Sequence, residues 1–448
     1  MDWSDVYKSK VVSAEEAVRV IRSGDWVDYG SICGQVRSLD LALAARKDEL
    51  EDVKVWSLLT LSPPKILEVD PTGETFTWNV WHFSGLDREM ANRGVPAYYA
   101  PIRYSELPRY VRSHIEPLNV AMLQVAPMDK HGYFNLGPQN SHCRAVCERA
   151  QIVIVEVNTN QPRCLGGYHE AIHISEINFV VEGANHPLPS LPPSQITSVD
   201  QKVAAFIMEE LVDGACIQLG IGSMPSAVGE MIAESDLKNL GCHTEMLCDA
   251  HLKMFQTGKL NGKLKTTDPG RMAYTFALGS QELYNFIDDN PICASYPVDY
   301  INRPFLAALN DNLITVNNAI EVDLYGQVCS ESIGTRHISG TGGQLDFVIA
   351  GYESRGGKSF ICLSSYFTGK DGQKKSRIVP TLTPGAVVTA PRSIAHFVVS
   401  EYGKLDLKGK TVWQRAEGLI NLAHPDLRDE LVAAARQQGI WRRSNKHE

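Results

Sequence analysis

Two stretches of the chain, SGDWVDYGSICG (23–34) and VDGACIQLGIGS (212–223), follow one plan. In each, a short apolar run follows a glycine, and a second glycine, Gly30 or Gly220, opens the turn behind the run. A short apolar run bounded by glycine turns indicates a buried strand that leads into a turn. The recurrence of this plan predicts two related α/β units within one chain.

A second pair of motifs recurs at nearly the same shift along the chain. These are LQVAPMDKHGYFNLG (123–137) and NNAIEVDLYGQVCSESIG (317–334). When they are aligned, Asp129 and Gly132 fall opposite Asp323 and Gly326. Two different motifs that repeat in register favour a duplicated unit over coincidence. Two related domains that face each other would place a ligand cleft at their junction.

Helices and strands are expected to alternate, because helical periods are separated by short apolar runs of strand length. The expected helices cover 14–24, 40–53 and 200–212. The expected strands cover 26–33, 53–61, 119–127, 150–158 and 215–222. This alternation predicts an α/β fold with mainly parallel sheets.

A segment without helical or strand period, EGANHPLPSLPPSQITS (182–198), separates the two halves. Its prolines, glycine and serines are typical of a linker. We therefore expect an N-terminal domain over 1–186, a Pro-rich linker over 187–198 and a C-terminal domain over 199–448.

The composition is that of a folded protein with two or three domains. The chain has 448 residues, of which 44% are hydrophobic and 21% charged, and its formal net charge is −9. This acidic balance argues against the basic footprint of a nucleic-acid-binding protein. No apolar run has the roughly 18 residues that a membrane helix needs, and MDWSDVYKSK (1–10) lacks the apolar stretch of a signal peptide. We therefore expect a cytoplasmic protein whose 10 cysteines are mostly reduced and buried.

The stretch LGCHTEMLCDAH (240–251) gathers thiols, imidazoles and carboxylates. Its cysteines and histidines lack the tight spacing of a zinc site, so no metal is predicted. A thiol nucleophile at Cys242 is disfavoured because its neighbour His243 would point to the opposite face of a strand. Glu245 falls in an expected short turn behind a strand, where open α/β sheets place their ligands. From the residues alone, buried thiols and a surface glutamate remain alternatives to a reactive site.

Two glycine clusters and a pair of asparagines are further candidates. QLGIGSMPSAV (218–228) forms a turn between a strand and a helix, which could present backbone N–H groups to an anion or an oxyanion. It matches neither a dinucleotide-binding fingerprint nor a P-loop. SGTGGQLDF (339–347) suggests backbone that approaches a ligand closely, with a flexible loop as the alternative. Asn317 and Asn318 carry side chains suited to hydrogen-bonding a carbonyl group.

Six motifs in one order resemble the acetyl-CoA hydrolase/transferase family, a branch of the family I CoA-transferases. They are GIGSMPSAV, LGCHTEML, NNAIEVDLYGQV, SGTGGQLDF, SRIVP and RAEGLINLAHPDLR. APMDKHGYFNLG and EVNTNQPR extend the resemblance into the first half, so that it spans essentially the whole chain. Within the family, the chain is most similar to the butyryl-CoA:acetate and 4-hydroxybutyrate CoA-transferases.

The resemblance implies two related NagB/RpiA-like α/β domains with mainly parallel sheets and an active site at their interface. It implies that Glu245, the glutamate of the G-x-H-T-E motif, is the catalytic nucleophile. The implied residues of the oxyanion and active-site surroundings are Gly220, Gly222, Asn317 and Gln35. The implied CoA-binding residues are Gly220, Ile221, Gly222, Gly342 and Gly343.

Two regions limit what can be transferred from the family. The stretch EYGKLDLKG (401–409) departs from the family pattern at Lys404 and Leu405, which leaves its expected contacts with CoA open. The acyl pocket is expected from Ser31 to Gln35 and around Ser57 to Leu61, but these segments form no fixed motif. The resemblance therefore does not identify the acyl group.

The activity implied by the resemblance is transfer of CoA from a short-chain acyl-CoA, of the butyryl-CoA or 4-hydroxybutyryl-CoA type, to a carboxylate such as acetate. The reaction would run by a ping-pong route through a glutamyl-CoA thioester on Glu245, with CoA as substrate and no permanently bound cofactor or metal. The family also implies a homodimer or larger homo-oligomer, and no nucleic-acid or membrane partner is expected. The alternatives are an acyl-CoA hydrolase on the same scaffold and, in another class, a non-catalytic acyl-CoA or sugar-phosphate sensor.

Overall fold

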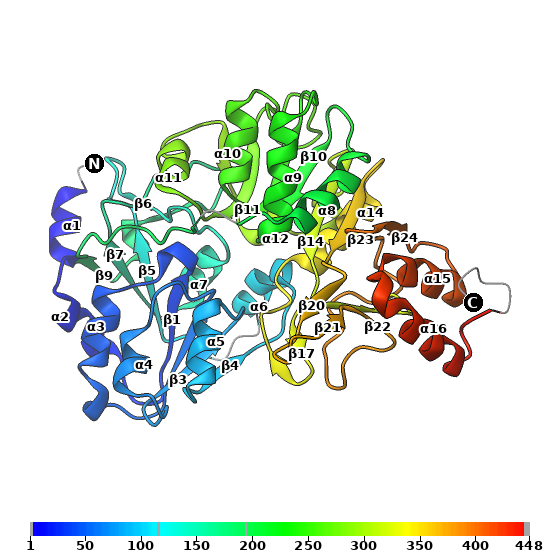
Figure 1. Cartoon of the computed structure of the whole chain (residues 1–448). Coiled ribbons are helices and arrows are strands. Elements are labelled where there is room, and N and C mark those ends of the chain that lie inside the picture. The colour runs from blue at the N-terminus through cyan, green and yellow to red at the C-terminus, as the bar shows by residue number, and fades with distance from the viewer. Residues whose placement is uncertain (1–2, 114–116, 193–194, 443–448) are drawn as a thin grey trace. The chain divides into compact units, whose positions relative to one another are not determined.

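The computed structural model of the chain describes residues 3–113, 117–192 and 195–442. Two large sheets dominate these residues, and helices lie along both (Figure 1). Smaller sheets complete the described part. They are β6 (Tyr133–Asn135) with β8 (Ala171–His173), β15 (Glu321–Asp323) with β16 (Val328–Cys329) and β22 (Ile378–Val379), β17 (Ser332–Ile333) with β18 (Arg336–His337), and β20 (Tyr366–Thr368) with β21 (Lys374–Ser376).

The first sheet has the strand order β4-β3-β2-β1-β5-β7-β9, and all of its neighbouring strands are parallel. The strands are β1 (Trp26–Ser31), β2 (Val53–Leu58), β3 (Phe76–Val80), β4 (Ala97–Tyr99), β5 (Val120–Val125), β7 (Ile152–Val157) and β9 (Phe179–Glu182). The helices of this region are α1 (Ser4–Lys10), α2 (Ala14–Ala17), α3 (Ser38–Ala44), α4 (Lys65–Val69), α5 (Gly85–Asn92), α6 (Leu107–Ser113) and α7 (Cys143–Arg149). Every residue of β5 is buried, as expected of a central parallel strand covered on both faces.

The second sheet has the strand order β13-β12-β11-β10-β14-β19-β23-β24. Its strands are β10 (Cys216–Leu219), β11 (Gly241–Leu247), β12 (Met272–Ala277), β13 (Cys293–Ser295), β14 (Leu313–Asn318), β19 (Lys358–Cys362), β23 (Phe397–Ser400) and β24 (Gly403–Asp406). The helices are α8 (Ser198–Met208), α9 (Ser223–Glu234), α10 (Asp249–Gln256), α11 (Gln281–Ile287), α12 (Val298–Ile301), α13 (Pro304–Ala307), α14 (Gln344–Glu353), α15 (Val412–Leu422) and α16 (Arg428–Gln437). The edge strand β24 pairs with β23 in the antiparallel direction.

The two sheets repeat one topology. The order β4-β3-β2-β1-β5-β7-β9 corresponds strand by strand to β13-β12-β11-β10-β14-β19-β23. The register also agrees, because Val27 of β1 pairs with Val120 of β5, and Ile217 of β10 pairs with Ile314 of β14. The predicted α/β fold with two related, mainly parallel sheets is therefore confirmed. In both sheets the order reverses between two central strands, and such a switch point is where open α/β sheets bind ligands.

The second repeated motif forms the same hairpin in both halves. The side-chain Oδ1 of Asp129 accepts N–H groups two and four residues ahead, at 2.8 and 2.9 Å. Oδ1 of Asp323 accepts the corresponding two N–H groups at 3.1 and 2.9 Å. Gly132 and Gly326 close the two turns with φ of 86° and 88°, values that suit glycine. The predicted alignment of these residues is confirmed.

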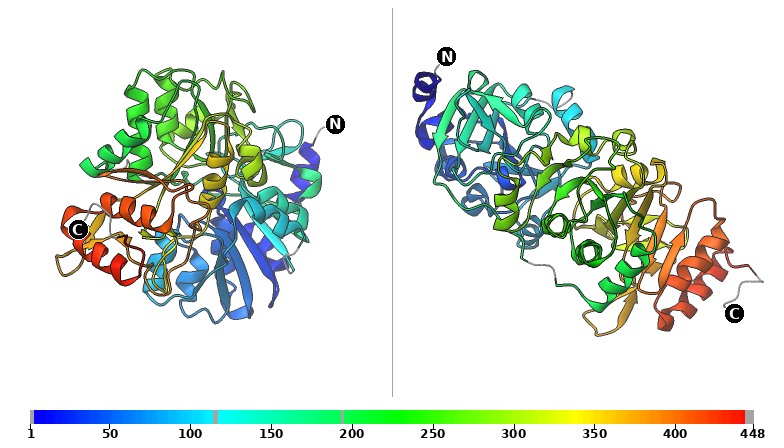
Figure 2. Two further views of the ribbon diagram at one scale, coloured as in Figure 1. Left: turned by 90° about the vertical axis from the view of Figure 1, so that its right-hand side faces the viewer. Right: turned by 90° about the horizontal axis from the view of Figure 1, so that it is seen from above.

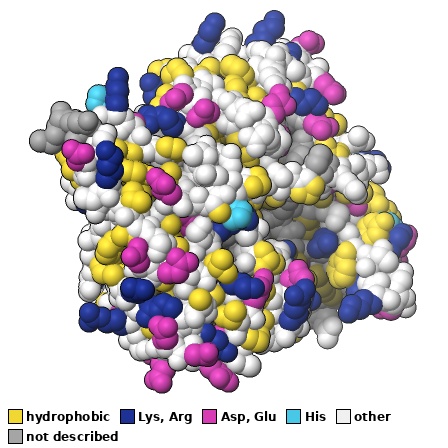
Figure 3. Space-filling view, turned by 90° about the vertical axis from the view of Figure 1, so that its left-hand side faces the viewer, with side chains coloured by type: hydrophobic (Ala, Val, Ile, Leu, Met, Phe, Trp, Pro, Cys, Tyr) yellow, Lys and Arg dark blue, Asp and Glu magenta, His cyan; other side chains and the backbone are white. Residues whose placement is uncertain are grey.

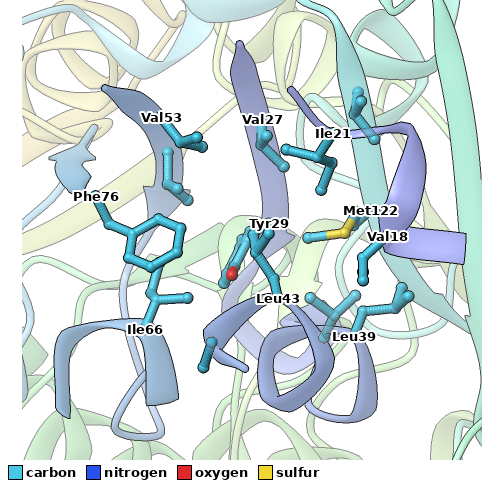
Figure 4. Packing of buried hydrophobic residues seen from close by; sticks show 14 of the residues in the cluster. Val18, Ile21, Val27, Tyr29, Leu39, Leu43, Val53, Ile66, Phe76 and Met122 are labelled. Atoms are coloured by element: carbon cyan, nitrogen blue, oxygen red, sulfur yellow. The ribbon is translucent and has the colours of Figure 1, made fainter. Parts of the chain in front are cut away.

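The core of the first sheet lies between its strands and helices α3 and α4 (Figure 4). In this view Phe76 of β3 points toward Ile66 of α4, and Val27 and Tyr29 of β1 and Met122 of β5 lie on the side of the sheet that α3 covers. Successive side chains of a strand point to opposite faces, so every second one lies on the same face. Val27 and Tyr29, two residues apart, therefore share one face of β1. This packing fixes the position of β1, which contains Gly30 near its end.

A buried carboxylate closes the beginning of α3. Glu156 of β7 is 1% exposed, and its Oε2 accepts the N–H groups of Arg37 at 3.1 Å and Leu39 at 3.0 Å. The first N–H groups of a helix have no partner within the helix, and a carboxylate there is favourable. In the second sheet, Cys362 of β19 pairs with Asn318 as Glu156 pairs with Gln124, so the equivalent position carries no carboxylate.

The expected strands are confirmed, whereas two of the expected helices are shorter than predicted. The helix expected over 14–24 is α2 followed by a 3-10 turn over Val18–Val20. The β-branched residues of this stretch lose side-chain freedom in an α-helix, which favours an early end. The helix expected over 40–53 ends at Ala44, and Lys47–Glu49 form a separate 3-10 turn. The helix expected over 200–212 is α8, which begins two residues earlier, at Ser198, and ends at Met208.

The chain divides into two compact units with a more complex boundary than a single linker. The first unit comprises Met1–Pro192, Glu245–Asp249 and Arg271–Ile301, and the second comprises Pro193–Thr244, Ala250–Gly270 and Asn302–Glu448. The boundaries expected at 186 and 199 stay a prediction. Of the expected linker, residues 193 and 194 lie outside the described residues, and 187–192 and 195–197 contain neither helix nor strand.

The C-terminal part has a second core cluster, in which α15 and α16 lie side by side next to β24 (Figures 1 and 2).

Among the described residues, no helix combines the length and the apolarity that crossing a membrane requires. On the face drawn in Figure 3, basic and acidic side chains are interspersed rather than gathered by sign.

Candidate active site

Glu245 lies within β11, four residues before the start of α10 at Asp249, and not in the short turn expected from the sequence. The strand begins at Gly241 and continues past Glu245, and β11 pairs in parallel with β10 through Cys216–Gly241 and Ile217–Cys242. All residues of β11 are buried except Glu245, which is half-buried. The strand therefore presents one carboxylate near its carboxyl end, between side chains that water does not reach.

A buried tyrosine lies near Glu245 in the first unit. Burial, and then the charge of Glu245, raises the pKa of Tyr104 well above its ordinary value. The Tyr104 hydroxyl forms a short hydrogen bond with the hydroxyl of Ser141, a buried residue with φ of 48°. Sequence reasoning missed Tyr104, because its place beside Glu245 depends on contacts between distant parts of the chain.

The GIG turn of the second unit lies against the end of β14. The N–H of Gly220 donates to the carbonyl of Val316 at 2.9 Å, and a Cβ on Gly220 would stand 3.3 Å from Oδ1 of Asn317. Gly222, the residue before α9, has φ of 124°, and a Cβ there would stand 2.7 Å from Nδ2 of Asn318. Ile221 between them is 48% exposed. The turn thus requires glycine at Gly222 and brings backbone, not side chains, to the start of a helix.

The two asparagines at the end of β14 hold this turn and the GTGGQ loop together. Nδ2 of Asn317 donates to Oε1 of Gln218 at 3.1 Å. Nδ2 of Asn318 donates to the carbonyl of Ile221 at 3.1 Å, and Nε2 of Gln344 donates to the carbonyl of Asn318 at 2.8 Å. Six predicted residues therefore belong to one neighbourhood of the second unit. They are Gly220, Ile221, Gly222, Asn317, Gly342 and Gly343.

Gln35 joins the two segments of the first unit that were expected to line an acyl pocket. Its Nε2 donates to Oγ of Ser57 at 2.8 Å, and its Oε1 accepts the N–H of Leu61 at 3.1 Å. Gln35 also borders a cavity of about 230 Å³, together with Arg37 and Asp40. Burial raises the pKa of Asp40 to about 6, although the backbone N–H groups that donate to its carboxylate act to lower this pKa. The side chain of Gln35 thus fixes the spacing of the loops behind β1 and β2.

The unusual residues of the EYGKLDLKG stretch have structural partners. Nζ of Lys404 donates to the carbonyl of Phe206 at 3.3 Å and to Oε2 of Glu209 at 3.0 Å, and also bonds Glu210. Leu405 packs against α15, where a Cβ on Gly418 would stand 2.5 Å from its Cδ1. Lys404 therefore ties β24 to the end of α8.

Apart from Cys248, which is half-buried, the thiols and imidazoles of LGCHTEMLCDAH form part of the interior. Cys242 is 0% exposed and His251 0%, and nine of the 10 cysteines are buried. Burial raises the pKa of Cys33 to about 12, which opposes the thiolate form that a nucleophile needs. Within the described ranges, no group of three or more His, Cys, Asp and Glu residues is arranged to hold a metal ion.

Comparison with known proteins gives matches over both halves of the chain. The N-terminal domain model of the acetyl-CoA hydrolase/transferase family matches residues 1–192, and its C-terminal domain model matches residues 279–435. The chain is 52% identical to the butyryl-CoA:acetate CoA-transferase of Anaerostipes caccae, over 100% of both chains. It is 51% identical to a probable butyrate:acetyl-CoA coenzyme A-transferase of Syntrophomonas wolfei, over 98% of both. Among solved structures, RipA from Yersinia pestis matches with a TM-score of 0.88 at 33% identity, over 98% of this chain and 100% of that one. The chain belongs to the acetyl-CoA hydrolase/transferase family.

Proposed function

We propose that this protein transfers coenzyme A from a short-chain acyl-CoA, of the butyryl-CoA type, to acetate or a similar carboxylate. The observation that carries the proposal is the 52% identity to a butyryl-CoA:acetate CoA-transferase over the full length of both chains. The half-buried carboxylate of Glu245 on β11 and the glycine turn at the start of α9 supply the chemical groups that such a transfer needs.

The proposed nucleophile is Glu245. A carboxylate surrounded by buried residues is less stabilised by water and attacks a thioester more readily. One carboxylate oxygen bonds to the thioester carbonyl carbon and expels CoA as a thiolate, which leaves an acyl-glutamyl anhydride. The thiolate then attacks the glutamyl carbonyl carbon and releases the first acid. An incoming carboxylate reverses both steps on the glutamyl-CoA thioester, so ping-pong kinetics are expected.

Each of these attacks places negative charge on a carbonyl oxygen, and the proposed donors are the GIG turn and Asn317. The start of α9 carries N–H groups without partners inside the helix, which suit an oxyanion. Ile217 of β10 pairs with Cys242 of β11. Gly220, the residue after β10, and Glu245 of β11 each lie three residues beyond this pair. This register supports a role of both residues at the same end of the sheet.

The proposal extends to the working state of the protein. It uses CoA thioesters as substrates and no permanently bound cofactor, because the transfer consists only of nucleophilic exchanges at carbonyl carbon. We also propose a cytoplasmic homodimer or larger homo-oligomer, in line with the expectation from the family. Light scattering of the purified protein would test the assembly, and a monomeric mass would contradict it.

The experiment that tests the function separates transfer from hydrolysis. The protein is incubated with butyryl-CoA, reduced with borohydride and mapped by peptide mass, and a glutamyl-CoA thioester at Glu245 appears as the alcohol. In a parallel assay, CoA release and acetyl-CoA formation are followed with and without acetate. Acetyl-CoA formation that depends on acetate supports the transferase. CoA release at the same rate without acetate would identify a hydrolase instead.

A matched pair of variants controls the assignment of the nucleophile. Glu245→Gln keeps the shape of the side chain but removes the anion, so it should give no adduct. Glu230→Gln changes an exposed glutamate on α9 and should form the Glu245 adduct normally. A modified cysteine beside an unmodified Glu245 would overturn the mechanism.

A further inference from the structure

We propose that Thr275 and Asn140 are positioning residues that hold the glutamyl group of Glu245 by hydrogen bonds while it carries the acyl group or CoA. This inference rests on the proposed function. Its evidence is the strand register of the first unit, which sets the three side chains in one row, together with the unsatisfied polar atoms of two of them.

The register of β11 and β12 follows from one backbone hydrogen bond near the end of both strands. The N–H of Leu278 donates to the carbonyl of Leu247 at 3.1 Å. The first sheet has the same bond between β3 and β2, where the N–H of Trp81 donates to the carbonyl of Ser57 at 3.0 Å. There, the partner of Ser57 across the ladder is Val80, the residue before the donor.

By the same rule, Leu247 stands across from Ala277. Two residues earlier on each of the parallel strands are Glu245 and Thr275, which therefore lie level with each other. Side chains two residues apart on a strand point to the same face, and paired residues share that face. Neighbouring strands lie roughly 4.8 Å apart, so the side chains of Glu245 and Thr275 are adjacent.

Asn140 extends this row on the other side of β12. Gln139 and Phe276 form an antiparallel bridge, and the N–H of Ser141 donates to the carbonyl of Thr275 at 3.1 Å. From the Gln139–Phe276 bridge, one step forward on one strand matches one step back on the other, and the Ser141 bond lies one residue beyond that register. Asn140 and Ser141 therefore together stand opposite Thr275, as the two residues of a β-bulge do. Residues opposite each other have their side chains on the same face. Glu245, Thr275 and Asn140 thus form a polar row across three neighbouring segments.

Two members of this row have unused hydrogen-bonding capacity. Thr275 and Asn140 are both 0% exposed. Oγ1 of Thr275 and both Oδ1 and Nδ2 of Asn140 have no hydrogen-bond partner among the described residues. Buried polar groups nearly always have partners, because an unsatisfied donor or acceptor is costly. The glutamyl group of Glu245 changes during the reaction cycle, and these free donors are available to bind its oxygen atoms when it does.

The segment that carries Asn140 is held in an irregular conformation. Ser141 has φ of 48°, a region that non-glycine residues rarely adopt. Its carbonyl accepts a hydrogen bond from the N–H of Val298 at 2.8 Å. Its hydroxyl forms a hydrogen bond with that of Tyr104, whose pKa is raised by burial and by the charge of Glu245. Strained backbone of this kind persists where surrounding contacts fix it, and it is frequent at functional sites. These contacts keep Asn140 in line with Thr275.

The row would act when the CoA thiolate attacks the glutamyl carbonyl carbon of the anhydride. The C–S bond forms as the electron pair of the C=O bond moves to oxygen, and collapse expels the acyl carboxylate without any net proton change. The Thr275 hydroxyl would donate to that glutamyl oxygen, and Nδ2 of Asn140 would donate to Oγ1 of Thr275. A donor of this kind stabilises the oxyanion more than the ground state.

The test compares the rate of Glu245 adduct formation in single-turnover experiments with butyryl-CoA. We expect Thr275→Val to slow adduct formation by about a hundredfold and Asn140→Ala by about tenfold, with unchanged KM for butyryl-CoA. Thr275→Ser retains the hydroxyl and should restore most of the rate. Ser295→Ala is the matched control, because the Ser295 hydroxyl is also buried and has no hydrogen-bond partner among the described residues. Ser295 stands across the strand ladder from Tyr274, the neighbour of Thr275, so its side chain lies on the opposite face from that of Thr275.

The outcomes separate this inference from the proposed function. Suppose that the wild type forms the adduct and that Thr275→Val forms it as fast as Ser295→Ala does. This result would overturn the inference and leave the proposed function intact. Absence of any adduct in the wild type would overturn the function itself. A loss in Thr275→Val that Thr275→Ser does not restore would identify a packing role and also contradict the inference, and thermal unfolding of each variant checks that it is folded.

Discussion

The two large sheets share their topology but differ at equivalent positions near the carboxyl ends of their central strands. In the first sheet, the residues three places beyond Val27, Val55 and Val120 are Gly30, Leu58 and Leu123. In the second sheet, the residues three places beyond Ile217, Cys242 and Ile314 are Gly220, Glu245 and Asn317. The glycine is common to both, whereas two leucines stand where the second sheet has a carboxylate and an amide.

This difference shows how little of the fold is needed to make a site. Leu58 and Leu123 are 4% and 1% exposed and fill space, while Glu245 is half-buried and Asn317 bonds Gln218. A register shift after Asp28 also sets Leu58 across from Ser31 in the first sheet. The topology supplies the location at a switch point in both sheets, and the residue choice at two positions supplies the chemistry.

The largest expected effect comes from removing the carboxylate of the second sheet. Glu245→Ala should lower the turnover of butyryl-CoA with acetate below about a thousandth of normal, because no other residue replaces the nucleophile. The variant should unfold at nearly the same temperature as the wild type, since Glu245 is only half-buried. Near-normal turnover would refute the assignment and remove the contrast between the sheets.

The second prediction transfers the carboxylate to the first sheet. Leu58→Glu should lower the free energy of unfolding by about 4 kcal/mol, since it removes a packed side chain and buries a charge. Urea unfolding measures this, and Leu58→Met, which keeps the volume, should cost less than about 1.5 kcal/mol. If Leu58→Glu were as stable as the wild type, the position would be open to water, and the two sheets would be more alike than their packing indicates.

The third prediction concerns the amide of the second sheet. Asn317→Ala should lower kcat about a hundredfold if the amide stabilises an oxyanion. Gln218→Leu removes only the partner of Asn317 and should have a much smaller effect on kcat. Equal losses in the two variants would mean that the pair has a structural role, as Leu123 has in the first sheet.

The smallest effect is expected at Asp28, whose counterpart in the second sheet is the neutral Gln218. Burial raises the pKa of Asp28 from its ordinary value of 3.8 to about 7, although the hydrogen bond from the N–H of Gly30 acts to lower it. Because the folded form keeps the proton to higher pH than the unfolded form, this group stabilises the fold at acid pH, and the contribution is lost as the pH rises through 7. Asp28→Asn should therefore gain about 2 kcal/mol of stability relative to the wild type between pH 5 and pH 8. Denaturant curves at the two pH values measure the difference, and a constant offset would contradict the assignment of the proton.

The sequence predicts those parts of the molecule that depend on local pattern. The apolar runs of β1, β5 and β10 and the glycines behind them were sufficient to find the repeat, because buried parallel strands are read directly as short apolar segments. The helix expected over 40–53 was predicted too long, because the charged residues 46–49 after Ala44 bury no side chain, and Lys47–Glu49 form a separate 3-10 turn. The family motifs identify Glu245 and the glycine loops. Tyr104, Asn140 and Thr275 gave no signal, since their places beside Glu245 arise from pairing between distant segments that no local pattern encodes.

The carboxylate of Glu156 at the start of α3 has a consequence for binding stoichiometry. It occupies the N–H groups of Arg37 and Leu39 with a negative charge that belongs to the protein itself. A phosphate or carboxylate ligand would be repelled there, whereas the equivalent position beside α9 carries the uncharged Cys362. Although the fold is doubled, the number of anion sites is not. Calorimetric titration with CoA is expected to give one equivalent per chain, and two equivalents would show that the first half has kept a site of its own.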